Sequence, residues 1–181
     1  MYTGIALPLL LGGCLVMLFG SEVTTSATLK PGPYFSLDGS GHLASFTVYA
    51  PQPGRKIAIP NDTKSEVWSL RPVSGGGAMV SGMNIRYGRV PDGYLQTVPH
   101  NGTAPVLVPG VVYHFFAETT GAPGAEGYFY MDKDTPILVD VPELCASAFV
   151  GDVKPVRCGS GQPYVEPKNL EKFVQEHRVQ N

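Results

Sequence analysis

Few side chains in this sequence combine the type and the spacing that catalysis needs. The four histidines, His42, His100, His114 and His177, are scattered along the chain. There is no Gly-x-Ser-x-Gly, His-Glu-x-x-His or phosphate-loop motif to mark a nucleophile, a zinc site or a nucleotide site. We therefore expect a protein that is not an enzyme and that needs no cofactor.

Two short patterns suggest metal binding, and neither is sufficient. Asp132 and Asp134 could share a calcium ion, but a calcium loop needs about six oxygen ligands and the residue between them is a lysine. The thioethers of Met79 and Met83, together with His100, would suit copper, but no second histidine is close in sequence. We expect a solvated turn at the first place, a glycine-rich loop at the second, and no metal.

The cysteines indicate an oxidising compartment. Cys145 and Cys158 form an even pair in the C-terminal part of the chain, and in an exported protein such a pair is most simply a disulfide. Zinc is the alternative, but it needs about four ligands, and neither cysteine has a histidine or another cysteine within a few residues. We expect the disulfide to close a short C-terminal loop.

The N-terminus resembles an export signal. Residues 5–19 form an uncharged apolar run long enough for a signal h-region. Residues 11–14, Leu-Gly-Gly-Cys, match a bacterial lipobox with Cys14 as the lipidation site, although the next residues stay apolar. Cleavage near residues 25–27 and an uncleaved anchor are the alternatives. All three predict an extracytoplasmic protein, either periplasmic, membrane-anchored as a lipoprotein, or secreted, which meets the membrane only through its N-terminal lipid or anchor.

Composition excludes one class of partner and indicates the fold class. The chain has 181 residues, a formal net charge of -2 and no run of lysine or arginine, so we expect no nucleic-acid partner. Its 22 glycines and 17 prolines separate short segments in which apolar and polar residues alternate. Such alternation is typical of half-buried strands. The expected strands lie at residues 42–51, 56–60, 66–72, 84–90, 94–98, 111–118, 127–131 and 136–141. This series predicts an all-β antiparallel sandwich.

A kink before one strand resembles a known corner. Leu107-x-Pro109-Gly110-x-x-Tyr113 is similar to the E-to-F corner of fibronectin type III and other immunoglobulin-like sandwiches, in which the tyrosine returns its hydroxyl to the corner backbone. Trp68 upstream stands at about the separation that family uses. The resemblance covers residues 43–134 and implies a Greek-key sandwich. It implies no activity, because that family contains mostly binding modules.

The last segment changes from a strand pattern to a helical one. Leu170, Phe173, Val174 and His177 recur at helical spacing after Pro167. A helix this short is not stable alone, so it must dock on the sandwich or on another protein. We divide the chain into a signal or anchor at 1–26, a lead-in linker at 27–42, the sandwich at 43–140, and a disulfide-pinned extension with the short helix at 141–181.

Strand alternation identifies a candidate binding patch. If Tyr113 faces the core, then His114 and Phe116 point out of the sandwich, and Tyr128 and Tyr130 on the next strand lie beside them. Either the C-terminal helix covers these aromatics, or they form an open surface for a sugar ring or a partner chain.

The expected function follows from export and from the fold. We expect a non-enzymatic binding or structural module of the bacterial cell envelope or surface, with another envelope protein or a polysaccharide as partner. A carbohydrate-recognition domain that uses exposed aromatics is the second hypothesis, and a small hydrolase with an unrecognised site is the third.

Overall fold

The computed structural model describes residues 26–30, 34–58, 63–140 and 167–179. They form two antiparallel sheets and one short helix, so the predicted all-β sandwich with a C-terminal helix is confirmed. Cys14, Cys145 and Cys158 lie outside the described residues. Lipidation and the disulfide therefore stay predictions.

The small sheet has three strands in the order β1-β2-β5. Its strands are β1 (Ser26–Lys30), β2 (Tyr34–Asp38) and β5 (Met83–Arg86). The first two lie in residues 27–42, where we expected a linker, so that expectation is corrected. Phe35 and Leu37 alternate with polar neighbours and are completely buried, but the strand is short, and the prolines and glycines around it suggested only turns.

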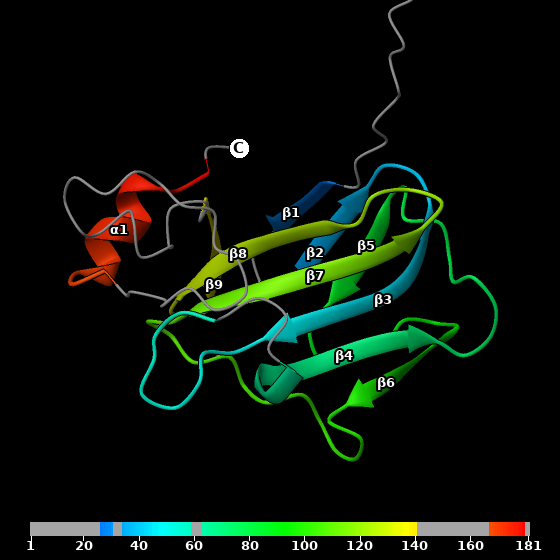
Figure 1. The fold of residues 1–181 in the computed structure, drawn as a ribbon, viewed down its shortest axis with the longest axis horizontal. Helices are drawn as coiled ribbons and strands as arrows, with labels where there is room; N and C mark the ends of the chain where they lie inside the picture. Colours follow the sequence, from blue (N-terminus) through cyan, green and yellow to red (C-terminus); the bar gives the residue numbers. More distant parts are fainter. Residues whose placement is uncertain (1–25, 31–33, 59–62, 141–166, 180–181) are drawn as a thin grey trace, which may run out of the picture.

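The large sheet has six strands in the order β6-β4-β3-β7-β8-β9. Its strands are β3 (His42–Tyr49), β4 (Glu66–Pro72), β6 (Tyr94–Val98), β7 (Val112–Thr120), β8 (Ala125–Asp132) and β9 (Thr135–Val139). A 3-10 helix, η1 (Thr63–Ser65), precedes β4. Figure 1 shows β1, β2 and β5 as a layer behind the large sheet.

Aromatic rings join the two sheets. The ring of Phe35 on β2 lies 4.9 Å from that of Phe46 on β3, 5.2 Å from Phe115 on β7 and 5.5 Å from Phe129 on β8, measured between centroids. All four rings are essentially inaccessible to solvent. One side chain of the small sheet therefore contacts three strands of the large sheet, and these contacts fix the spacing of the layers.

The kink before β7 contains the hydrogen bond that its sequence predicts. The hydroxyl of Tyr113 accepts a hydrogen bond of 2.7 Å from the backbone N–H of Val108. Gly110 has φ +81°, which other residues rarely adopt, so the turn depends on glycine there. Burial raises the pKa of the Tyr113 phenol, so the hydroxyl stays protonated. The ring of Tyr113 also stacks on that of Phe129 at 5.3 Å, so the corner is tied to the core.

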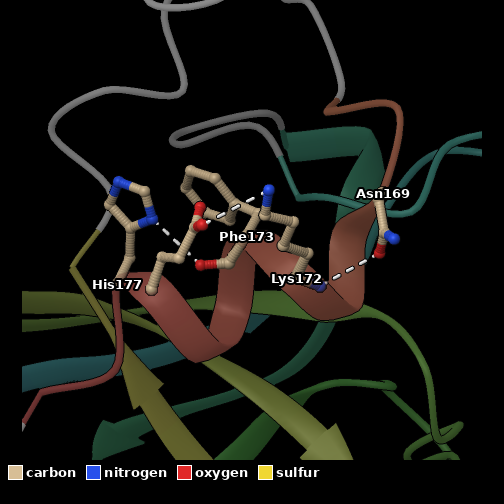
Figure 2. Close-up of polar contacts among 5 residues, drawn as sticks. Asn169, Lys172, Phe173 and His177 are labelled. Carbon is tan, nitrogen blue, oxygen red and sulfur yellow. Dashed lines mark hydrogen bonds and ion pairs between the residues drawn. The ribbon is translucent and has the colours of Figure 1, made fainter.

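The helix α1 (Leu170–Glu176) has local caps at both ends (Figure 2). At its start, the side-chain oxygen of Asn169 accepts a hydrogen bond of 3.0 Å from the N–H of Lys172. At its end, the imidazole of His177 stacks on Phe173 with the centroids 4.0 Å apart, and its Nδ1 lies 2.9 Å from the Phe173 carbonyl oxygen. These contacts satisfy polar groups that a short helix leaves unpaired.

The chain after α1 returns to the edge of the large sheet. The N–H of Asp140 donates to the carbonyl of His177 at 2.8 Å, and the N–H of Val179 donates to the carbonyl of Leu138 at 3.1 Å. The helix is therefore attached to β9 through backbone hydrogen bonds as well as through its apolar side chains.

Candidate functional site

The outer face of the large sheet, which points away from the small sheet, changes in polarity along its strands. On β7 the inward residues Tyr113, Phe115 and Ala117 belong to the core, as predicted from strand alternation. The outward residues of the same strand run from Val112 through His114 and Phe116 to the exposed Glu118. One end of the face is therefore apolar and the other end is polar.

The apolar end is covered by α1, and we call it the helix-covered half. It consists of the outward side chains Val112, Tyr130, Ile137 and Val139, with Tyr128 packed at the margin and Ile57 joining from outside the sheet. Leu170, Phe173 and Val174 of the helix pack on these residues and are themselves buried. The predicted docking of the helix on the sandwich is therefore confirmed, but of the four predicted site residues only Tyr130 and Tyr128 belong to the surface on which it packs. Tyr130 is only 8% exposed, so the expectation that it forms an open binding surface is corrected.

His114 lies at the boundary and is fully buried, so its predicted exposure is also wrong. The rings of Tyr49 on β3 and Tyr128 on β8 flank its imidazole at 5.5 Å and 4.8 Å between centroids. Its Nε2 lies 3.4 Å from Oε2 of the exposed Glu126, but neither ring nitrogen has a hydrogen-bond partner among the described residues. Burial lowers the pKa of His114 to about 4, so the side chain is neutral near pH 7. Strand alternation gave the direction of the side chain correctly, but it could not show that neighbouring tyrosines enclose it.

The polar end of the outer face is hollow, and we call it the groove. Its volume is about 360 Å³. The strands β3, β4, β6 and β7 supply most of its wall. The lining residues are Ser45, Thr47, Tyr49, Glu66, Ser69, Arg71, Thr97, Val98, Phe116 and Glu118. Figure 1 shows α1 beside the ends of β8 and β9, far from β4 and β6.

Hydroxyl groups in the groove are held in pairs across neighbouring strands. The hydroxyl of Ser45 donates a hydrogen bond of 2.8 Å to Oε2 of Glu118, its register partner on β7. The hydroxyls of Thr47 and Ser69, register partners on β3 and β4, lie 3.0 Å apart. Each pair fixes the positions of its oxygen atoms before any ligand arrives, which reduces the entropy cost of binding.

Phe116 adds a partly exposed aromatic ring to these polar groups, and Tyr49, which is only 6% exposed, adds a phenol hydroxyl. Phe116 lies opposite Thr47 in the β3–β7 register and is partly exposed. Burial raises the pKa of the Tyr49 phenol, and the carboxylates of Glu66 and Glu118 raise it further, so its hydroxyl is a donor at neutral pH. Arg71 contributes an exposed guanidinium on β4. The groove can therefore offer an apolar ring, neutral hydroxyls and charges of both signs to one ligand.

The two candidate metal patterns lie elsewhere. Asp132 and Asp134 belong to the exposed turn between β8 and β9, in which Lys133 has φ +53°. Met79 is 60% exposed, whereas Met83 packs against the core from β5. Within residues 26–30, 34–58, 63–140 and 167–179, no three histidine, cysteine or carboxylate side chains are grouped as metal ligands. No helix in the same ranges is long and apolar enough to span a membrane.

Of the four predicted site residues, the groove contains only Phe116. Tyr130 is under the helix, Tyr128 is at its margin, and His114 is enclosed between tyrosines. The sequence reasoning missed the hydroxyl and charged residues of β3 and β4. The alternation of small polar residues with Phe46 and Val48 was the available signal, because it places serine and threonine together on one outward face.

Comparison with known proteins gives no relative. No protein-family model matches the chain, and no curated protein or solved structure matches it. Function must therefore be argued from the groove and the fold.

Proposed function

We propose that this chain is an exported, non-enzymatic binding module of the bacterial cell envelope or surface, and that the groove is its binding surface. The observation that carries the proposal is the contrast within one sheet face. The chain covers the apolar half with its own helix and leaves open a hollow of about 360 Å³ with prearranged polar groups. Concave surfaces with a few convergent polar groups are typical of binding sites.

We also infer that the sandwich is immunoglobulin-like. The sheet orders β1-β2-β5 and β8-β7-β3-β4 support this, since they correspond to A-B-E and G-F-C-C′ in that fold. The Tyr113 hydroxyl bond at the start of β7 supports it as well, because β7 takes the place of strand F.

Three features depart from the immunoglobulin pattern. β9 adds a strand to the large sheet beyond β8, the counterpart of strand G. β6 extends the large sheet beyond β4, where strand C″ would lie, but it follows β5 in the sequence rather than preceding it. Trp68 lies on β4, the counterpart of C′, and not on the counterpart of strand C. Its ring contacts Tyr87 at 5.2 Å, and its Nε1 donates to Gln96 at 3.0 Å. A module with these additions has a wider outer face than a minimal sandwich, and the groove extends from β3, β4 and β7 onto the added β6.

A carbohydrate is the ligand class that the groove favours. Sugar hydroxyls need both donors and acceptors, and Ser45, Thr47, Tyr49 and Glu118 supply both. The partly exposed ring of Phe116 offers an apolar surface beside them for the C–H face of a sugar ring. We therefore take a polysaccharide as the partner, and an envelope protein as the alternative.

The proposal assigns no catalytic step to the groove. None of the described residues that line it is a histidine or cysteine, but Glu66 and Glu118 are two carboxylates, the residue type that glycoside hydrolases use. Release of soluble sugar from a bound polysaccharide would instead support the hydrolase hypothesis.

Retention on insoluble polysaccharides tests the ligand class. We expect the full-length protein to be retained by at least one polysaccharide, and Phe116→Ala and Glu118→Gln to lose retention by about tenfold or more in affinity, because each removes a contact from the groove. Val106→Ala is the matched control, because Val106 is 89% exposed and does not line the groove. If no polysaccharide retains the protein, or if Phe116→Ala is retained as strongly as the wild type, carbohydrate is not the ligand of the groove. Either result would favour a protein partner.

Intact mass tests export and processing. The unreduced mature protein should be lighter by two hydrogens than its thiol form, because Cys145 and Cys158 are paired. Its N-terminus should begin at an acylated Cys14 or beyond residue 21. Free thiols at both positions would contradict the disulfide and with it the proposed compartment.

A further inference from the structure

The small sheet carries a second hollow, on the opposite layer from the groove. Its volume is about 300 Å³, and its wall includes Tyr34, Asn84, Arg86, Arg89 and Asp92. Tyr34 and Asn84 alternate along their strands with the buried Phe35 and Ile85, so this wall faces solvent.

Two arginines are brought together here by the backbone. Arg86 ends β5, and the N–H of Arg89 donates to the carbonyl of Arg86 at 3.0 Å, which closes a tight turn. Gly88 within this turn has φ +75°, a conformation that suits glycine. Tyr87 anchors the turn from the core side through its hydroxyl, which donates to the carbonyl of Pro105 at 2.8 Å. The turn therefore holds both guanidinium groups beside the same hollow.

Neither guanidinium is neutralised within the described part of the chain. Neither Arg86 nor Arg89 takes part in the ion pairs that the described residues form, such as Lys172–Glu176. Asp92 also lines the hollow but is not within ion-pair distance of either arginine. Two like charges on one short turn repel each other, and an anion between them would remove that cost.

Arg86 is also held in a defined position. Its guanidinium carbon lies 5.3 Å from the ring centre of Tyr34, its register partner on β2. This cation–π contact restricts the guanidinium group without using its N–H donors. Arginine presents these donors as a planar fork that matches two oxygens of a carboxylate or phosphate.

We infer that this hollow, which we call the arginine site, binds an anionic group, a phosphate or a carboxylate, through Arg86 and Arg89. Tyr34 is placed to add a hydroxyl donor, and the side chain of Asn84 lies on the same wall. The inference is independent of the groove, because the two hollows share no lining residue and belong to different sheets. An anionic polymer could therefore be held on one layer while the groove engages another ligand.

Titration of the full-length protein with inorganic phosphate and with acetate, each against chloride at constant ionic strength, tests the arginine site. NMR signals of the Arg86 and Arg89 side chains should shift and saturate with phosphate, with acetate or with both, and the anion that saturates identifies the chemical source. Arg86→Gln and Arg89→Gln should each weaken the binding at least about tenfold. Arg178→Gln is the control, because it makes the same charge change at an exposed arginine that lines neither hollow, and it should leave the titration unchanged.

Three results would overturn the inference. The first is that neither anion saturates the shifts. The second is that the two glutamine variants bind as well as the wild type. The third is that Arg178→Gln weakens binding equally, which would indicate general charge attraction. If the protein binds the anion normally but is retained on no polysaccharide, only the groove proposal is contradicted. The failures of the two proposals are therefore distinguishable.

Discussion

The two halves of the outer face of the large sheet share the strand β7 but differ in the chemistry of their side chains. In the helix-covered half, the outward positions are Val112, Tyr130, Ile137 and Val139, and a helix with three buried apolar residues packs on them. In the groove, the outward positions of β3 and β4 carry Ser45, Thr47 and Ser69, which are only 4–7% exposed but line a hollow of about 360 Å³ that α1 does not cover. The difference shows that the polarity of the outward positions determines where the C-terminal helix docks. The alternation of inward and outward residues does not determine where the helix docks, because it is the same in both halves.

His114 marks the transition between the halves. Its side chain is buried, like those of the helix-covered half, and polar, like those of the groove. Neither ring nitrogen has a hydrogen-bond partner among the described residues. A buried polar group in this state costs free energy of folding. The boundary is therefore the place where a change of charge should have a large effect.

Phe173→Ala should have the largest effect on stability. Phe173 is 5% exposed and packs in the helix-covered half, so truncation should lower the free energy of unfolding by about 3 to 5 kcal/mol. Denaturant unfolding measures this, and binding of an apolar dye should rise as the sheet is uncovered. Gln175→Ala on the exposed side of α1 is the control, expected within about 0.5 kcal/mol of wild type. Equal stability of the two variants would show that the helix does not stabilise the sandwich.

Acid should destabilise the boundary through His114. Because burial lowers its pKa from 6.5 to about 4, the unfolded chain binds more protons between these values. His114 therefore imposes no protonation penalty above about pH 6.5, and the free energy of unfolding falls by roughly 3 kcal/mol in total as the pH drops toward 4. Unfolding curves at pH 7 and pH 4 should show a smaller loss for His114→Phe than for wild type. The same loss in both proteins would assign the acid sensitivity to carboxylates instead.

Tyr113→Phe tests the strand that both halves share. The variant leaves the N–H of Val108 without the hydroxyl that accepts its hydrogen bond, and we expect a loss of about 1 to 2 kcal/mol. The melting temperature measures the loss, and the secondary structure should stay the same. An unchanged melting temperature would remove the structural role of the corner and weaken the immunoglobulin-like interpretation.

The smallest effect is expected in the groove. Thr47→Val combined with Ser69→Ala removes both members of one hydroxyl pair. The Tyr49 hydroxyl loses its hydrogen bond with Thr47, so stability should fall by at most about 1 kcal/mol. Polysaccharide retention should nevertheless fall. A large loss of stability would show that the pair serves the fold, and the contrast between the two halves would then disappear.

The sequence by itself determined the features that depend on local pattern. Alternation predicted most strands and which side chains of β7 and β8 point away from the core. The kink before Tyr113 predicted its hydroxyl bond, and the spacing of Leu170, Phe173 and Val174 predicted a helix that must dock. These predictions succeed because each depends on residues close together in the chain, where period and turn geometry are sufficient.

Only the tertiary structure decided which outward residues are accessible. Strand period gives the side of the sheet that a residue faces, but not what lies over it. His114 is enclosed by tyrosines of two neighbouring strands, and Tyr130 is covered by a helix about forty residues later in the chain. The groove likewise requires Ser45 and Glu118, 73 residues apart, to meet across one strand pair. Such contacts depend on strand order and register, which the alternation of one segment does not encode.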